Sequence, residues 1–230
     1  MEDYQIFKHI PKNYTAMGEI FCRKGTLDTF VVNEQDGEYG TINSFVGKTV
    51  MDIGANIGAF SRYAIARGAK SVIAFESDPD NYKMLLLNTV NVPVACNNLA
   101  VVADEDPEEL ELYIASGKNK GQHTLRKTRG RKTVKVKTVK LSPLLDCIRP
   151  DILKVDVEGY EHKLFSEDLL FWPDELVMEI HLHKPEFEKA SLTTVNNIKK
   201  FGNYNKWVGL LKVMFSEHDV QDDTIHFLRE

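Results

Sequence analysis

The feature that most constrains the fold is an apolar strand-like segment, residues 49–51, that leads through a glycine loop into a helix-like segment, residues 57–67. The loop, residues 52–58, contains Gly54 and Gly58. A second apolar segment and a second helical pattern follow at 71–75 and 79–87. Alternating strands and helices, with strands apolar on both faces, predict a doubly wound α/β fold, a parallel sheet with helices on both faces.

The remaining segments extend this pattern within one domain, which a chain of 230 residues is long enough to form. We expect a lead-in over 1–48 that packs on the core, with a strand candidate at 29–32 and turns over 33–40. Further predicted strands lie at 98–102, 110–115, 134–141, 151–155 and 175–180. Predicted helices lie at 164–170 and 185–201, and a final antiparallel pair lies at 207–215 and 224–228. The two strands in the stretch from about 104 to 141 have a polar linker, which indicates an inserted β excursion.

The glycine loop and a distal acid together predict a site for an adenosine-containing cofactor. A helix N-terminus presents unpaired N–H groups, and Glu76 ends the second strand, where an acid accepts hydrogen bonds from ribose hydroxyls. The loop reads G-x-N-x-G, so Asn56 stands where a dinucleotide site has its second glycine. This favours a smaller amino-acid moiety over a pyrophosphate, although an NAD(P)-dependent oxidoreductase is the competing enzyme class.

Three ordered blocks, at 52–61, 74–79 and 153–161, resemble the FkbM family of S-adenosylmethionine-dependent methyltransferases. The resemblance covers about residues 48–183 and implies that 49–230 forms a class I, Rossmann-like methyltransferase domain. It implies a mostly parallel seven-stranded sheet with an antiparallel C-terminal strand, and methyl transfer usually to oxygen, often of a sugar or polyketide-type hydroxyl. The cofactor would be S-adenosylmethionine and the product S-adenosylhomocysteine. The implied cofactor-binding residues are Asp52, Gly54, Ala55, Asn56, Gly58, Phe60, Ser61, Glu76, Ser77 and Asp156, with 98–101 near adenine.

An acidic cluster follows the predicted strand at 151–155, on the cofactor side of the sheet. Asp156 and Glu158 are candidates to orient the acceptor and cofactor, or to take the proton that a hydroxyl acceptor loses as it attacks. The alternative is that Glu158 and Glu161 only cap the following helix.

The strand at 175–180 ends in a second polar group. In extended geometry Glu179, His181 and His183 point to one face, where Glu179 or His181 would act as base or orient the substrate. A divalent metal held with Asp156 is a less favoured alternative, because no tight ligand motif is present, and we assign no metal-binding residue.

Residues 118–140 carry ten lysines and arginines and no acidic residue, in a chain with a net charge of −5. The alternation over 134–139 indicates a strand with one wet face, for which a solvated edge that resists aggregation is sufficient. The alternatives are an anionic acceptor, drawn to the cleft, or a binding protein for anions or nucleic acid. Nucleic acid is less favoured because the segment lacks aromatic residues for base stacking. His123 is expected to be exposed and incidental.

The remaining features predict a soluble, cytoplasmic enzyme that acts on a small molecule or glycan. The three cysteines show no metal-binding spacing and fit reduced thiols in a cytosol-like compartment. The N-terminus is too polar for a signal peptide, and no segment approaches the ~20 apolar residues of a membrane span.

Overall fold

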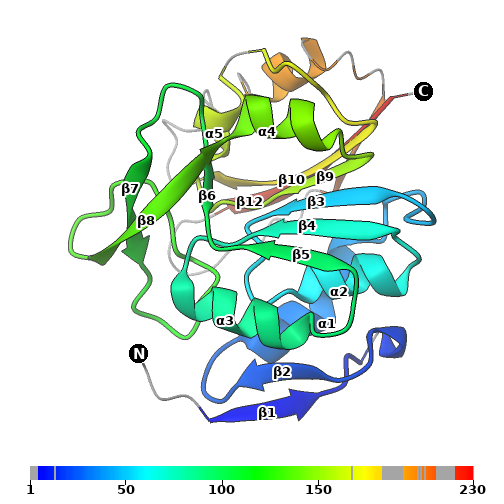
Figure 1. Cartoon of the computed structure of the whole chain (residues 1–230), viewed down its shortest axis with the longest axis vertical. Coiled ribbons are helices and arrows are strands. Elements are labelled where there is room, and N and C mark those ends of the chain that lie inside the picture. The colour runs from blue at the N-terminus through cyan, green and yellow to red at the C-terminus, as the bar shows by residue number, and fades with distance from the viewer. Residues whose placement is uncertain are drawn as a thin grey trace.

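A computed structural model describes residues 5–12, 14–166, 168–182, 194–200, 202, 204, 206–210 and 221–229 (Figure 1). Within these residues, the central sheet has the order β11-β12-β10-β9-β3-β4-β5. Its strands are β3 (Thr49–Ile53), β4 (Ser71–Phe75), β5 (Val94–Asn97), β9 (Ile152–Val155), β10 (Glu175–Leu182), β11 (Lys206–Leu210) and β12 (Gln221–Leu228). Only β12 runs against the others, since it pairs antiparallel with both β10 and β11. The predicted mostly parallel α/β sheet and the antiparallel final pair are confirmed.

Helices cover both faces of this sheet (Figure 1). One face carries α1 (Asp28–Tyr39), α2 (Ala59–Ala66) and α3 (Pro79–Asn88), and the other carries α4 (Leu141–Ile148) and α5 (Glu161–Leu164). Neighbouring residues of one strand enter different cores: Val50 packs with α1 and α2, whereas Met51 packs with α4. The strands are therefore apolar on both faces because each face is buried.

The lead-in differs from its prediction. Residues 29–32 were predicted as a strand and 33–40 as turns, but 29–39 belong to α1 and Gly40 is its C-cap. The β-branched residues at 29–32 favour strands by propensity, but Val32, Gln35 and Tyr39, spaced as on one helical face, are buried. Tertiary packing thus outweighs the local preference. The preceding residues form a hairpin of β1 (Ile6–His9) and β2 (Ile20–Arg23) and a single 3-10 turn, η1 (Thr15–Met17).

The predicted β excursion is confirmed, although its boundaries differ. A separate sheet has the order β6-β8-β7, formed by β6 (Ala100–Val102), β7 (Glu109–Ile114) and β8 (Lys132–Lys140). The strand predicted at 98–102 is present as β6, but it belongs to this separate sheet, and the third strand of the main sheet is β5, which ends at Asn97.

The helices in the second half of the chain differ in part from their predictions. The predicted helix at 164–170 was wrong: α5 begins at Glu161 and ends at Leu164, because the chain turns into the helix directly after Gly159. Residues 194–200 are helical, as predicted, but the other residues of the predicted helix at 185–201 lie outside the described residues. The same holds for 211–215 of the final strand pair. Helix α4 was not predicted.

Candidate functional site

The glycine loop is shaped by contacts with its own chain. Gly54 has a φ of +78°, and a Cβ there would lie 1.7 Å from the carbonyl oxygen of Asp156. Gly58 has a φ of +87°, and a Cβ there would lie 2.9 Å from Cδ1 of Leu85 in α3. Glycine at these two positions therefore lets the end of β9 and helix α3 approach the loop, and the contact of these glycines with a ligand stays a prediction.

Two adjoining cavities lie between the glycine loop, the end of β9 and the loop from β7 to β8. The inner cavity is about 50 Å³ and the outer cavity about 450 Å³, which is within the usual range for ligand sites. Five residues line both cavities: Gly54, Asn56, Gly121, Asp156 and Glu158. The cleft thus lies beyond the carboxyl ends of parallel strands, where α/β sheets bind ligands.

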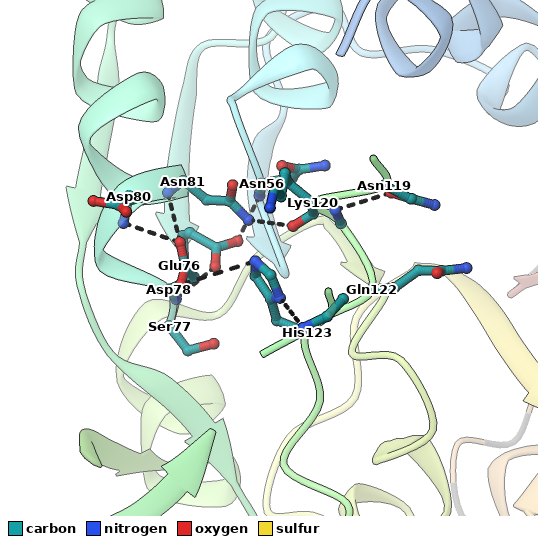
Figure 2. Close-up of polar contacts among 12 residues, drawn as sticks. Asn56, Glu76, Ser77, Asp78, Asp80, Asn81, Asn119, Lys120, Gln122 and His123 are labelled. Atoms are coloured by element: carbon teal, nitrogen blue, oxygen red, sulfur yellow. Dashed lines mark hydrogen bonds and ion pairs between the residues drawn. The ribbon is translucent and has the colours of Figure 1, made fainter. Parts of the chain in front are cut away.

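Glu76 follows β4 and lies beside the glycine loop (Figure 2). Its carboxylate accepts hydrogen bonds from the backbone N–H groups of Asn56 and Asp78, each at 2.7 Å. Burial raises the pKa of Glu76 to about 7, even though both N–H groups favour the charged form. Glu76 lines the inner cavity, and Asn56 reaches both.

We expect Glu76→Gln to change how stability depends on pH. The folded pKa, about 7, lies above the ordinary 4.5, so the folded protein holds this proton more tightly and loses stability as pH rises through that window. The difference in unfolding free energy, Glu76→Gln minus wild type, should therefore be about 2 to 3 kcal/mol larger at pH 8 than at pH 5. Urea unfolding at both pH values measures this, and a constant difference would contradict it.

Lys154 is a site residue that sequence reasoning missed. Its side chain is buried, and Nζ donates to the carbonyl oxygen of Gly54 at 2.8 Å. Nζ also lies 3.4 Å from Oδ1 of Asp52 and 3.5 Å from Oδ2 of Asp156. Burial opposes its charge, but these carboxylates outweigh burial, so the pKa of Lys154 lies above its ordinary value. The feature of the sequence that could have identified Lys154 is a charged residue within an otherwise apolar strand, because charged side chains are seldom buried without a partner.

Asp52 lies behind the loop and lines neither cavity. Its side chain is fully buried, and Ser61 Oγ donates to its Oδ2 at 2.6 Å. Burial raises the pKa of Asp52, while Lys154 and Ser61 oppose this shift. Asp52, Ser61 and Gly58 therefore support the site from outside the cavities.

The other predicted site residues are distributed over both cavities. Ala55, Phe60 and Glu179 line the outer cavity, and Ser77 lines the inner one. The backbone of His181 belongs to β10, whereas its side chain and all of His183 lie outside what the structure describes.

The turn after β9 is held by Glu161. Its Oε1 accepts hydrogen bonds from the N–H groups of Val157 and Gly159, which precede α5. Glu161 therefore fixes the turn and does not cap the helix, because the N-cap of α5 is Tyr160 and no side chain caps it. The turn places Glu158 in a left-handed conformation with a φ of +53°. Non-glycine residues in this conformation are strained and often functional, and Glu158 lines both cavities.

The basic segment contributes to the cleft as well as to the surface. On β8, Lys135 and Lys137 are exposed while Val136 is buried, so the predicted wet face is confirmed around Val136, although Val134 is exposed as well. His123 was expected to be exposed, but its side chain is only 6% exposed and lines the inner cavity. Its Nδ1 accepts a hydrogen bond from the N–H of Ala115 at 2.9 Å, and burial lowers its pKa. A contact eight residues along the chain thus turns His123 inward.

The family assignment follows from the sequence match. The model of the methyltransferase FkbM domain matches residues 52–219, which is more than half of the chain. This chain belongs to the FkbM methyltransferase family. The matched range begins at Asp52, near the end of β3, so α1 and the hairpin before it precede the match. No curated protein matches the sequence.

Solved structures show the same class I methyltransferase fold at low sequence identity. TYW2 of Pyrococcus horikoshii, in complex with MeSAdo, matches with a TM-score of 0.56 and 14% identity, over 99% of this chain and 72% of that one. TYW2 of M. jannaschii, in complex with AdoMet, matches at 0.52 and 14%, over 99% and 87%. The Pyrococcus abyssi tRNA (uracil-54, C5)-methyltransferase, in complex with S-adenosyl-L-homocysteine, matches at 0.52 and 14%, over 97% and 44%.

Two further findings concern the part of the chain that the structure describes. No group of three or more His, Cys, Asp or Glu side chains there is arranged to hold a metal ion. No described helix is long and apolar enough to cross a membrane.

Proposed function

We propose that this FkbM-family protein transfers a methyl group from S-adenosylmethionine to a hydroxyl group of a small molecule or glycan. The observation that carries the proposal is that Asp156 and Glu158 line both cavities. A carboxylate at this junction lies within the space where a methyl donor and an acceptor would meet.

The residues that line the inner cavity suit the adenosine part of the cofactor. Glu76 offers a carboxylate to the ribose hydroxyls, as expected for an acid that follows the second parallel strand of the core. Asn56 Oδ1 is buried and has no hydrogen-bond partner within the described residues, so it suits a donor such as the cofactor ammonium group. Apolar residues that suit a flat purine line the cavity: Ile53, Phe75, Leu99, Ala100, Val101, Leu112 and Leu125.

The residues around the junction suit transfer to oxygen. S-adenosylmethionine, when bound, supplies the methyl group, whose bond to sulfur breaks as the bond to the acceptor oxygen forms, with the electron pair left on sulfur. Glu158 accepts the hydroxyl proton, and the hydrogen bonds from its turn to Glu161 hold it in place. Asp156 is fixed by Lys154 at 3.5 Å and orients the acceptor.

Glu158→Gln is expected to lower kcat by about 10²- to 10⁴-fold, the usual contribution of a general base, while affinity for S-adenosylhomocysteine stays within about threefold. Asp156→Asn should also lower kcat with retained affinity. The assay is transfer of labelled methyl from S-adenosylmethionine to a panel of sugars and glycans, with calorimetry for affinity. The exposed Glu109→Gln on β7 is the control.

Glu179→Gln and His181→Gln test the other end of the cleft. Glu179 lines the outer cavity, and His181 follows two residues later in β10. Full activity in Glu158→Gln with loss in either of these variants would move the base to β10. The proposed function would be overturned if calorimetry showed that the protein binds NAD but binds neither S-adenosylmethionine nor S-adenosylhomocysteine.

A further inference from the structure

Helix α1 forms one wall of the outer cavity. Residues spaced three or four apart along one face of the helix line it: Leu27, immediately before the helix, and Phe30, Val31, Gln35, Glu38 and Tyr39. The helix precedes the range that the FkbM domain model matches, so this wall is built outside the shared domain.

Helix α1 is anchored at both ends, so its wall is fixed before any ligand binds. Asp28 receives two hydrogen bonds from the buried Arg23 side chain, which also donates to Asn81 of α3. One turn from the other end of the helix, Asp36 accepts a hydrogen bond from the Tyr63 hydroxyl of α2 at 3.0 Å. Preorganised walls bind ligands without a cost of ordering.

Gln35 is a residue of this wall with a buried acceptor to which no described residue donates a hydrogen bond. Its side chain is 3% exposed, and Nε2 donates to the carbonyl oxygen of Val31 at 2.9 Å. This bond fixes the orientation of the amide, because an oxygen in that position would face another oxygen. Oε1 is buried and has no hydrogen-bond partner within the described residues, although Gln35 lines a cavity. Such a group is costly unless a ligand or water donates to it.

The charges around the outer cavity determine which acceptors fit. Four carboxylates line it, from Glu38, Asp156, Glu158 and Glu179. Lys154 also lines it, but its ammonium group already contacts Gly54 O, Asp52 and Asp156. An anionic acceptor would be repelled by these carboxylates, whereas a neutral molecule rich in hydroxyl groups could donate hydrogen bonds to them.

We propose that Gln35 is a specificity-determining residue whose Oε1 accepts a hydrogen bond from a neutral, hydroxyl-rich acceptor, and that the half-exposed Phe30 covers an apolar face of that molecule. This inference rests on the proposed methyltransferase function. It replaces the anionic acceptor considered from the basic segment, because the lysines of β8 do not line the cavity.

The first test compares Gln35→Met with wild type, using a panel of neutral methyl hexosides and disaccharides. Methionine keeps the length of the side chain and removes the oxygen. KM for the best neutral substrate should rise at least tenfold, kcat should stay within threefold, and the Kd of S-adenosylhomocysteine within twofold. Melting temperature should not fall, because the variant loses one hydrogen bond but also an unpaired buried oxygen. An unchanged KM, or a raised Kd with a lowered melting temperature, would overturn the role of Gln35.

The second test compares Phe30→Ala with Phe7→Ala. Phe30 is 47% exposed at the cavity, and Phe7 is 41% exposed on β1, away from it. Only Phe30→Ala should raise KM, by about three- to tenfold; equal effects would overturn the contact.

Substrate charge provides the last arm of the test. Wild type should methylate the neutral hexosides at least tenfold more efficiently than hexose 6-phosphates. A preference for the phosphates, or no transfer to any neutral probe while S-adenosylhomocysteine still binds, overturns this inference and leaves the cofactor assignment in place. If wild type does not bind S-adenosylhomocysteine, the proposed function itself fails.

Discussion

Gly54→Ala is expected to destabilise the protein by more than about 4 kcal/mol and to prevent folding at ordinary temperature. The new Cβ would lie 1.7 Å from the carbonyl oxygen of Asp156 and 2.9 Å from its carbonyl carbon. Both contacts are with backbone, so no side-chain rotation relieves them. The parallel strands β3 and β9, which pair from Val50 to Ile53, would have to separate at the centre of the sheet.

Gly25→Ala is the matched control for Gly54→Ala. Gly25 has a φ of +81°, close to that of Gly54, but a Cβ there meets nothing within 4 Å. The control should therefore cost only the left-handed conformation, about 1 to 2 kcal/mol. Urea unfolding, or the yield of folded protein where Gly54→Ala does not fold, compares the two. Equal losses would show that backbone strain, and not the approach of Asp156, makes Gly54 necessary.

Lys154→Met is expected to cost about 3 to 5 kcal/mol of stability at pH 8, the usual effect of removing one partner of a buried ion pair. Asp52 is fully buried and, within the described residues, would keep only the Ser61 hydroxyl as a side-chain partner. The control is Lys83→Met, because Lys83 pairs with Asp80 at 2.8 Å on the surface, with both side chains well exposed. That change should cost less than about 1 kcal/mol.

The pH dependence of Lys154→Met separates a charge effect from a packing effect. Burial already raises the pKa of Asp52, and loss of the lysine raises it further. A carboxyl group with a raised folded pKa destabilises the protein as pH rises above its unfolded value, so the variant should lose less stability at pH 5 than at pH 8. The same loss at both pH values would show that Lys154 acts through packing alone.

The sequence by itself determined the parallel core, the loop that contains Gly54, and Glu76 at the end of the second core strand. These features are local: an apolar segment, a glycine pair and an acid at a strand end are each read within a few residues. Their order along the chain then indicates an α/β sheet with its cleft at one edge. The family resemblance, confirmed over 52–219, added the methyltransferase assignment.

Tertiary structure decided the rest of the site. The start of α1 has the local pattern of a strand, and it forms a helix because its buried face packs against α2. Lys154 interrupts an apolar strand, and its role is clear only from the hydrogen bond that it donates to Gly54, 100 residues away. His123 belongs to a basic surface segment, yet it turns into the inner cavity. In each case the energy that fixes the residue comes from partners distant in sequence, whose approach no local pattern encodes.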